Sequence, residues 1–542
     1  MSSDIIIKFI IIVVLILLAV LMVKLLPKFM SGGGEVCTKN ECACAEFISI
    51  DESPDVCGSC NHNILYHTKR ADLGGLSEIN MGVDLDTQDY KKDQAKLFKG
   101  LTERYPKEKI LYRIVDIFKL NRIDIEMVLV FTIPPGKTTI TLPIIEEGGP
   151  DEFGYYVEWG NDSSGELIYT YNNKSYEYLV DDEAREYTVK IFGLGITGFG
   201  CMDSEGEEHR LYENYSKYLT SVISFGKLGH KFTNLSYAFS KCHSLTNVPL
   251  YLPANITIVD GMFKQCVKLI DNRLEEWRVD NIVSSMGMFQ MCSTFNGNLS
   301  RWNLKNLTSA NFMFLNCRDF EGADLNNWGL NNLNHAIAMF RNCVKFEGQS
   351  LDRWNLNNLM LSNSMFNGCT SFVCNDVSNW GLSNLIDADY MFNGCASFVG
   401  TGSNNWNLNK LTNAGHMFNN CVKFVFDDVS NWGLTSLVEG DYMFNNCTNF
   451  IGTGSNNWNL NNLTKADGMF AGCSNFTYNS DKYLDLRKWG LRSLQTADQM
   501  FLDCNKFNGN LSRCKIPVLL THDKNMFLHC NLLAEYRPFL TD

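Results

Sequence analysis

Residues 443–450 read MFNNCTNF, and close variants of this phrase return along the chain: MFNGCASF begins at residue 391, MFNGCTSF at 365 and MFLNCRDF at 313. A cysteine that recurs in one phrase has four conceivable roles: a metal ligand, a disulfide partner, a nucleophile, or a small apolar residue in a repeated core. The spacing of the copies, and the residues that recur with the cysteine, distinguish these roles.

The cysteine recurs at a nearly constant interval. Successive copies lie 24, 26 and 25 residues apart, then 26 residues apart six times, then 31 and 26. The copies are Cys242, Cys266, Cys292, Cys317, Cys343, Cys369, Cys395, Cys421, Cys447, Cys473, Cys504 and Cys530. A fixed period of this length indicates a solenoid of stacked coils rather than a globular enzyme.

Each full unit also carries a tryptophan, usually eleven residues after its cysteine. In the unit WNLNNLTKADGMFAGCSNF, Trp458 and Leu460 alternate as in a short strand. The apolar residues from Ala466 to Cys473 fall on one face of a short helix. The bend IGTGSNN predicts a turn, and the asparagines of such bends tolerate a left-handed backbone. We therefore expect about 12 coils, each with a short strand, a turn and a short helix.

No metal-binding partner recurs with the cysteine, so we interpret it as a buried free thiol that packs as a small hydrophobe. Occasional disulfides between adjacent coils stay open as an alternative. The stretch 376–421 nearly repeats at 428–473, and a singular catalytic site would not persist as paired copies. No nucleophile motif, phosphate loop or carboxylate pair stands out. The chain is therefore predicted not to be an enzyme and to bind no small-molecule substrate.

The units resemble the BspA-like leucine-rich repeat family of surface proteins, a repeat also found in mycoplasma lipoproteins, protist surface proteins and giant DNA viruses. The pattern W-x-[VL]-x-x-[VL]-T-x-[AM]-x-x-M-F-x-x-C-x-x-[FL] covers residues 235–533, and the lead-in at 201–234 also matches. Near the end Cys514 stands where tryptophan belongs, and residues 534–542 are expected to cap the stack. The resemblance implies surface display and protein or cell contact, without catalytic residues.

The N-terminus has the composition of a membrane segment. Residues 5–26 are apolar except for Lys8 and Lys24, and about 20 apolar residues cross a hydrocarbon core of roughly 30 Å. A cleavable signal peptide is the alternative, but Asp4 lies in its basic region and no small-residue cleavage site follows. Residues 1–30 are therefore predicted to anchor the chain in a lipid bilayer. This predicts a single-pass, N-terminally anchored membrane protein, whose orientation the flanking lysines leave open.

Residues 31–70 hold a compact cluster of cysteine and histidine residues. Two cysteine pairs, spaced C-x-C and C-x-x-C, are separated by twelve residues and followed by two histidines, which matches zinc-ligand spacing. The candidate ligands are Cys42, Cys44, Cys57, Cys60, His62 and His67. Two disulfides that leave Cys37 unpaired, or unrelated thiols, are the alternatives. Because a closed four-ligand site has no open position, the zinc ion is expected to be structural.

Between this cluster and the repeats, residues 71–122 predict a linker of two amphipathic helices, broken by Pro106. From residue 123 the pattern changes to short β-branched and aromatic runs, which predict a β-sandwich of roughly five to seven strands at 123–200. The turn WGND at 159–162 resembles part of the W-G-D-G signature of the PKD-type immunoglobulin-like fold. That resemblance implies a spacer or interaction domain.

The formal charge of −13 and the lack of a basic stripe give no sign of a nucleic-acid surface, so no nucleic-acid partner is expected. We expect a multi-domain protein with a transmembrane helix, a zinc-binding segment, a β-sandwich and a leucine-rich-repeat-like solenoid. The leading hypothesis is a membrane-anchored structural or interaction protein that binds a protein partner on the solenoid surface. A giant-virus virion or its membrane is one location that the analogy suggests. The alternative is a cell-surface adhesin or receptor ectodomain that binds a host or matrix protein.

Overall fold

The computed structural model divides the chain into two compact units, Met1–Glu126 and Met127–Asp542. The described residues are 49–50 and 53–57 (backbone only), 126–146, 155–161, 166–168, 175–193, 196–200, 213–226, 232–270, 272–425, 428–477, 486–514, 516–517, 525–538 and 540–541. In the first unit, β1 (Ser49–Ile50) and β2 (Ser53–Cys57) pair antiparallel. The predicted membrane span at 5–26 and the predicted helical linker at 71–122 lie outside the described residues.

A β-rich domain begins the second unit. Its main sheet has the strand order β11-β3-β9-β6-β7. These strands are β3 (Met127–Ile133), β6 (Tyr155–Glu158), β7 (Glu166–Ile168), β9 (Arg185–Gly193) and β11 (Leu219–Ser224). Two smaller sheets pair β4 (Gly136–Thr141) with β8 (Ser175–Val180), and β5 (Ile144–Glu146) with β10 (Ile196–Phe199). Residues of β3 are alternately buried and partly exposed, so one face of the strand forms the core.

The turn at 159–161 is held by close backbone contacts. Gly160 has φ of 75°, and a Cβ atom at this position would lie 2.6 Å from the carbonyl oxygen of Thr188. The hydroxyl of Tyr178 donates a hydrogen bond to the carbonyl of Trp159 over 2.7 Å. Burial raises the pKa of Tyr178, so its hydroxyl stays protonated and keeps donating. Glycine is therefore required here for both its φ angle and its small size.

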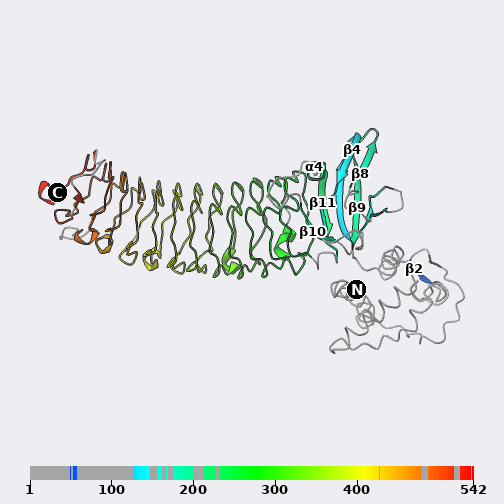
Figure 1. The fold of residues 1–542 in the computed structure, drawn as a ribbon, viewed down its shortest axis with the longest axis horizontal. Helices are drawn as coiled ribbons and strands as arrows, with labels where there is room; N and C mark the ends of the chain where they lie inside the picture. The colour runs from blue at the N-terminus through cyan, green and yellow to red at the C-terminus, as the bar shows by residue number, and fades with distance from the viewer. Residues whose placement is uncertain are drawn as a thin grey trace, which may run out of the picture. The chain divides into compact units, whose positions relative to one another are not determined.

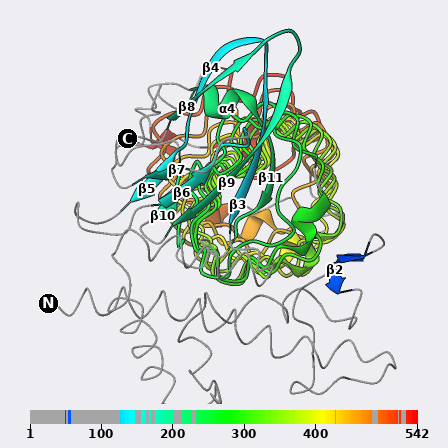
Figure 2. The same ribbon diagram turned by 90° about the vertical axis from the view of Figure 1, so that its right-hand side faces the viewer.

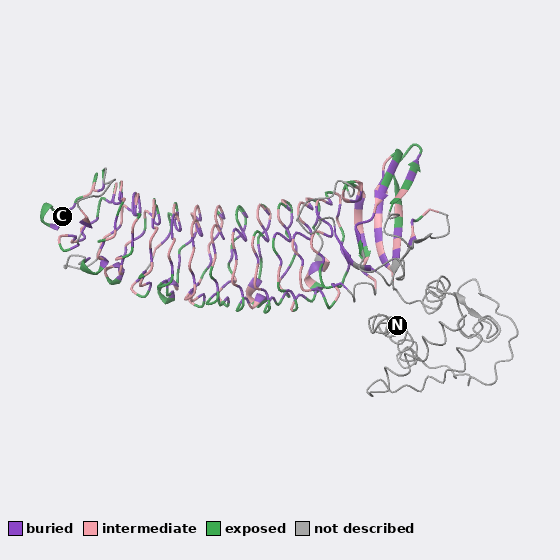
Figure 3. Cartoon of the chain, viewed as in Figure 1, coloured by how far each residue is buried: buried purple, intermediate pink, exposed green. Residues whose placement is uncertain are grey.

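The rest of the second unit is a stack of coils, which Figure 1 shows from the side. Viewed along the stack, successive coils superpose (Figure 2). Neighbouring coils are joined by single-residue parallel β-bridges that repeat with the intervals of the cysteines. The bridged residues from the second coil onward include Ile258, Ser284, Ser309, His335, Leu361, Asp387, Asn413, Glu439, Lys465 and Thr496. The side chains that face the inside of the coils are buried, and the bends are exposed (Figure 3).

Backbone hydrogen bonds in each coil alternate between two partners. The N–H of Tyr442 donates to the carbonyl of Asp467 in the next coil over 2.7 Å, and that of Phe444 donates to Met469 over 2.8 Å. The N–H of Asn445, between them in sequence, closes a turn onto Tyr442 within its own coil at 3.1 Å. Every second peptide therefore links coils, while the others form turns.

Two left-handed residues in every coil exclude the helix that the apolar spacing predicts. In the coil of Cys473, Gly468 has φ of 58° and Gly472 has φ of 75°. The equivalent residues of the preceding coil, Tyr442 and Asn446, have φ of 54° and 59°. An α-helix requires negative φ at each residue, and left-handed residues interrupt it. The predicted short helix at 466–473 is therefore wrong, and the segment is a series of turns.

The predicted fold class is accordingly corrected. The one α-helix among the described residues is α4 (Glu213–Tyr218), which precedes the coils. The other helical elements in this part of the chain are 3₁₀ turns: η4 (Asn272–Glu276), η5 (Leu325–Trp328), η6 (Ser403–Asn405), η7 (Ser455–Asn457), η8 (Arg487–Trp489) and η9 (Ala534–Tyr536). The expected leucine-rich-repeat-like solenoid, with a strand and a helix in each repeat, is replaced by stacked turns joined at single bridges.

The predicted membrane location is also corrected. Of the helices in the described ranges, none combines the length and the apolar character needed to cross a bilayer. The predicted span at 5–26 is not among those ranges, so no described element supports it. We therefore withdraw the prediction of a transmembrane helix and of a single-pass, N-terminally anchored membrane protein.

Columns of like residues fill the inside of the stack. The rings of Phe418 and Phe444 stack with centroids 5.5 Å apart, and those of Trp432 and Trp458 with centroids 5.9 Å apart. The indole Nε1 of Trp458 also donates to the carbonyl of Val429 over 2.9 Å. Because each ring packs on its copies above and below, no coil buries its apolar face alone.

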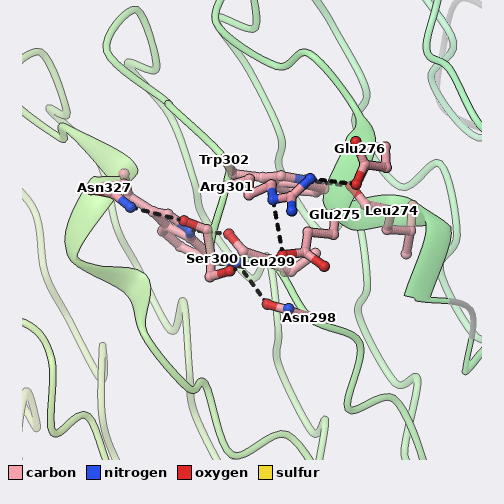
Figure 4. A network of polar contacts seen from close by, with 10 residues as sticks. Leu274, Glu275, Glu276, Asn298, Leu299, Ser300, Arg301, Trp302 and Asn327 are labelled. Carbon is pink, nitrogen blue, oxygen red and sulfur yellow. Dashed lines mark hydrogen bonds and ion pairs between the residues drawn. The ribbon is translucent and has the colours of Figure 1, made fainter.

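Polar contacts join the tryptophan sides of neighbouring coils, as Figure 4 shows for one junction. Trp302 Nε1 donates to the carbonyl of Leu274 over 2.7 Å. Next to it, the guanidinium of Arg301 lies 2.5 Å from Glu276 and 3.3 Å from Glu275. The buried indole fixes the register of the two coils, while the exposed ion pairs add little to stability.

Candidate functional site

The six predicted zinc ligands are not brought together by the described structure. Five of them lie outside the described residues, and Cys57 is described only as the last backbone position of β2. Among the residues with described side chains, no group of three or more His, Cys, Asp or Glu residues is arranged to hold a metal ion. The zinc site therefore stays a prediction from sequence.

The repeat cysteines of the stack are free thiols. The Sγ atom of Cys447 donates to the carbonyl of Phe418 in the preceding coil over 3.0 Å, and equivalent bonds occur along the column. Burial raises the pKa of Cys292 to about 12. Cys530 is an exception because it is partly exposed and a hydrogen bond with the Cys504 thiol lowers its pKa. The buried thiols are structural donors and poor nucleophiles.

The exposed side chains of each coil repeat in a fixed order along one segment. We call this segment the bridge strand, and it begins at the bridged residue eight places before the cysteine. In the coil of Cys395, Asp387, Asp389 and Tyr390 are partly exposed, whereas Ala388 is buried. The residues eight, six and five places before the cysteine form an outer ladder, which we call the bridge-strand face; it is interrupted where these positions are buried, as at Ala338 and Gly415.

The bridge-strand face is acidic on the coils of Cys395 to Cys504. The carboxylates at the positions eight and six places before the cysteine are Asp387, Asp389, Glu439, Asp441, Asp467 and Asp498. Lys465 occupies one of these positions, and its Nζ lies 2.7 Å from Glu439. Two carboxylates also help to join coils, because Asp441 Oδ1 accepts the N–H of Asp467 over 2.8 Å and Asp467 Oδ1 accepts that of Asp498.

Three aromatic side chains stack next to these carboxylates. The rings of Tyr390 and His416 are 4.3 Å apart between centroids, with 5° between their planes. The rings of His416 and Tyr442 are 5.0 Å apart, with 24° between their planes. These residues occupy the left-handed position of three successive coils, with φ of 54° to 57°. Their order along the stack produces a partly exposed aromatic row beside an acidic one.

The carboxylates of this face are held in an environment that opposes their ionisation. Desolvation, and then the charges of Asp387 and Glu439, raise the pKa of Asp389 to about 6. Desolvation is also the main cause of the raised pKa of Asp441. Partial burial between two tyrosines lowers the pKa of His416, so the ring is neutral at pH 7 and supplies no positive charge. A cation from outside the chain would offset this excess of negative charge.

Gly415 leaves a gap in the acidic row. Its neighbours at the same position are Asp389 in the preceding coil and Asp441 in the next coil. A Cβ atom on Gly415 would lie 2.8 Å from Asp389 Oδ1. The missing side chain therefore provides the space that the Asp389 carboxylate occupies over the backbone of the next coil.

The sequence contains a signal for this face that is separate from the core pattern. Aspartate stands six places before the cysteine at residues 389, 441, 467 and 498. An aromatic residue follows it at 390 and 442. Alignment of the copies by their cysteine would have shown an acidic column beside the core pattern.

Stacked coils with inner columns of phenylalanine, tryptophan and free thiols, and with an outer ladder of side chains, define a repeat protein. The sequence matches the family described as "Mycoplasma protein of unknown function, DUF285" in three overlapping segments, residues 233–354, 337–454 and 421–536. Together these segments cover more than half of the 542 residues, so the chain belongs to this family. No curated protein and no solved structure matches the chain. The resemblances to the BspA-like repeat and the PKD-type fold stay predictions.

Proposed function

We propose that this protein is an interaction scaffold whose bridge-strand face binds a basic segment of a protein partner. The observation that carries the proposal is the excess of carboxylates beside the Tyr390, His416 and Tyr442 stack. Within the described coils from Cys395 to Cys504, the bridge-strand face offers a single lysine against six carboxylates. Aromatic rings beside carboxylates suit arginine and lysine, which pair with the acids and pack on the rings.

The spacing of the face favours an extended partner segment. Equivalent residues of adjacent coils are joined by a β-bridge, so the acidic positions repeat at roughly the 4.8 Å spacing of neighbouring strands. In an extended basic segment that crosses the coils, alternate side chains would lie about 7 Å apart. Each of them could therefore reach a carboxylate on the nearest coil or on the coil after it. Charge complementarity of this kind increases the association rate and gives specificity.

The proposal is tested by calorimetric titration of the full chain with an unstructured arginine-rich peptide. The double variant Asp389→Asn with Glu439→Gln removes two charges beside the aromatic stack. We expect its affinity to fall by roughly tenfold or more, and the affinity of the unchanged chain to fall with added salt. The matched control is Asp260→Asn, which removes a carboxylate from the same position of a distant coil. Equal affinities for all three chains would contradict the proposal.

Surface display, which the BspA-like resemblance implies, supports a role in contact with another protein. An adhesin or receptor ectodomain would use the same face, and the two hypotheses differ in location and in partner. A virion location rests on analogy alone and stays a prediction. No catalytic role is proposed.

The predicted structural zinc ion is tested separately from the interaction face. Mass spectrometry of the full chain under native conditions should show one bound zinc ion, which is lost on acidification. Replacement of Cys57 and Cys60 by serine should abolish this mass difference. Two disulfides in the unreduced chain, detected as a mass four hydrogens lower than that of the reduced chain, would instead support the alternative.

A further inference from the structure

Inner coils pass four hydrogen bonds from the bridge strand to the next coil. The donors are the N–H groups seven, five, three and one places before the cysteine. In the coil of Cys447 these are Gly440, Tyr442, Phe444 and Asn446, which donate to carbonyls of the following coil over 2.9, 2.7, 2.8 and 2.7 Å. The acceptors belong to the segment at 464–472. This set of bonds is the coil-to-coil interface that the stack repeats along its length.

The coil of Cys530 has the last three of these donors among its described residues, and the described residues form no following coil. They are the N–H groups of Asn525, Phe527 and His529. Over the described part of the chain, none of the three has a hydrogen-bond acceptor. Asn525 and His529 keep the left-handed φ angles of the inner coils, 58° and 62°, so the backbone is already in the repeating conformation. We call residues 525–530 the open edge.

The C-terminal tail covers only the other side of this coil. The N–H of Leu511 donates to the carbonyl of Tyr536 over 2.9 Å. The strand β12 (Ile516–Pro517) pairs in parallel with β13 (Leu540–Thr541). The tail thus takes the place of a following coil on the side of the stack where tryptophan and leucine pack in the inner repeats. In the described ranges, no tail residue accepts a bond from the N–H groups on the outer side of the bridge strand.

The side chains of the open edge are also incompletely covered. Phe527 ends the inner phenylalanine column, with its ring 5.5 Å from that of Phe501 and 6° between their planes. Phe501 is fully buried, but Phe527 is partly exposed, and the neighbouring Leu528 is 41% exposed. An aromatic column therefore ends on a partly exposed ring, next to three N–H donors that have no acceptor among the described residues.

We propose that the open edge binds an apolar segment of a partner protein, which adds to the stack as a further bridge strand in the turn conformation of the inner coils. The segment would accept hydrogen bonds from Asn525, Phe527 and His529 through alternate carbonyls. It would also place an aromatic side chain on Phe527, as each inner coil does for the coil before it. Main-chain bonds would supply affinity, and the aromatic position would supply specificity, as in other cases of strand addition.

A second copy of the chain does not fit this edge. Two open edges placed end to end would oppose donors to donors. The complementary carbonyls at the start of the stack are covered by the β-rich domain: Tyr215 donates its hydroxyl to Ala238 over 3.5 Å, and Gly200 lies against the carbonyl of Ser236. The occupant must therefore be a segment with free carbonyls, which a partner segment in the turn conformation of an inner coil provides.

The probe for this edge is the synthetic peptide TKADGMFAG, which copies residues 464–472. In the chain this segment accepts the four bonds of the Cys447 coil. Hydrogen–deuterium exchange of the full chain would be measured at single-amide resolution, with and without saturating peptide. We expect the exchange of Asn525, Phe527 and His529 to slow by roughly tenfold or more, and a scrambled peptide to have no effect.

Two variants sharpen the test. Phe527→Lys should abolish the effect of the peptide, because it places a charge on the ring position. The matched control Leu533→Lys, at a leucine of the tail that is 49% exposed, should retain the effect. If the amides of Phe501 and Asp503 also exchange faster in Phe527→Lys, the coil has unfolded in this variant. The test then rests on the unchanged chain, where only the copied peptide, and not the scrambled one, should slow exchange at the open edge.

Three results would overturn the inference. The first is equal exchange of the three amides with and without the peptide. The second is equal slowing by the scrambled peptide. The third is slow exchange of these amides in the free chain, at the rate of Tyr442, Phe444 and Asn446, which would mean that the chain itself covers the edge. The acidic face lies on other coils, so none of these results bears on the proposed function.

Discussion

The residue before each repeat cysteine shows why the phrases MFNGC and MFNNC recur. This position has a left-handed backbone in every described coil, including Gly394, Asn420, Asn446 and Gly472. This conformation costs most residues about 1–2 kcal/mol, whereas glycine adopts it without this cost and asparagine at a lower cost. The position also allows the cysteine N–H to close its turn onto the phenylalanine three places earlier, as in Cys447 to Phe444 at 3.0 Å. The frequent Asn and Gly at this position therefore reflect a backbone preference, although residues such as Gln265 and Met291 adopt the same conformation in other coils.

Substitution of Gly472 tests this requirement. Its φ is 75°, and a Cβ atom would lie 2.4 Å from Asn446 Oδ1, at the end of a side chain that can move. We expect Gly472→Ala to lower the free energy of unfolding by about 1–2 kcal/mol. Gly472→Asn introduces the residue that the two preceding coils carry at this position, and it should lower the free energy of unfolding by less than Gly472→Ala does. Urea unfolding followed by tryptophan fluorescence measures both, and a smaller loss for alanine than for asparagine would contradict the account.

Asp389 provides a residue-scale test of the acidic face. Its pKa is raised from 3.8 to about 6, so the folded chain favours the neutral carboxyl. The stability that this preference contributes is present below pH 3.8 and is lost as the pH rises through about 6. Asp389→Asn should therefore raise the melting temperature at pH 7.5 and change it little at pH 3.5. Asp260→Asn serves as the control for loss of a carboxylate, and an equal effect of Asp389→Asn at both pH values would refute the assignment.

At the scale of the element, the thiol column is a set of identical hydrogen bonds rather than apolar filling alone. Each inner thiol donates to a phenylalanine carbonyl of the preceding coil, as Cys421 does to Phe392 over 3.0 Å. A thiolate cannot donate, and burial opposes its formation, so the pKa values of Cys369, Cys421 and Cys473 are strongly raised. The folded column requires protonated sulfur.

The column predicts loss of stability in alkaline solution. The ordinary pKa of the thiol is 9.0, and that of Cys292 in the fold is about 12. The stability contributed by a protonated thiol is present below pH 9 and is lost as the pH rises toward 12. Each such thiol lowers the free energy of unfolding by about 1.4 kcal/mol per pH unit in this range. Urea unfolding at pH 8 and pH 10 measures the loss.

The control for this prediction is Cys292→Ala. The variant should be less stable at pH 8, because it loses a hydrogen bond and leaves a cavity. Between pH 8 and pH 10, the free energy of unfolding of the variant should fall by less than that of the unmodified chain. The difference between the two losses should equal the contribution of one thiol. An unchanged difference between variant and unmodified chain at the two pH values would show that Cys292 does not titrate on unfolding.

Apolar spacing predicts which residues of a coil face inward, but it does not predict the local backbone. Ala466, Met469, Phe470 and Cys473 are all buried, as their recurrence suggests. Their spacing is compatible with a helix, and only the left-handed angles of Gly468 and Gly472 exclude it. Those angles are favoured by the hydrogen bonds to the next coil, which are tertiary contacts. The acidic face was missed for a related reason, since its residues are adjacent only between coils.

At the scale of the whole molecule, the repeat converts a short motif into a long, regular surface. Bridges such as Asp387 to Asn413 and Asn413 to Glu439 hold equivalent side chains side by side. The buried columns fix the position of each coil, so the bridge-strand face is preorganised and loses little conformational entropy when a partner binds. The charge on this face is local, because the coils before Cys395 carry mostly neutral residues at the same positions, such as Ser309, Asn311 and Asn363.

Carboxyl footprinting tests the location of the binding face most directly. The full chain would be labelled with a carbodiimide and an amine, with and without saturating arginine-rich peptide, and the modified residues identified by mass spectrometry. The account predicts that the peptide reduces labelling of Asp389, Glu439 and Asp441 and leaves that of Asp260 and Glu276 unchanged. Equal protection of all these carboxylates, or protection confined to residues outside the bridge-strand face, would contradict the central claim that this face is the interaction site.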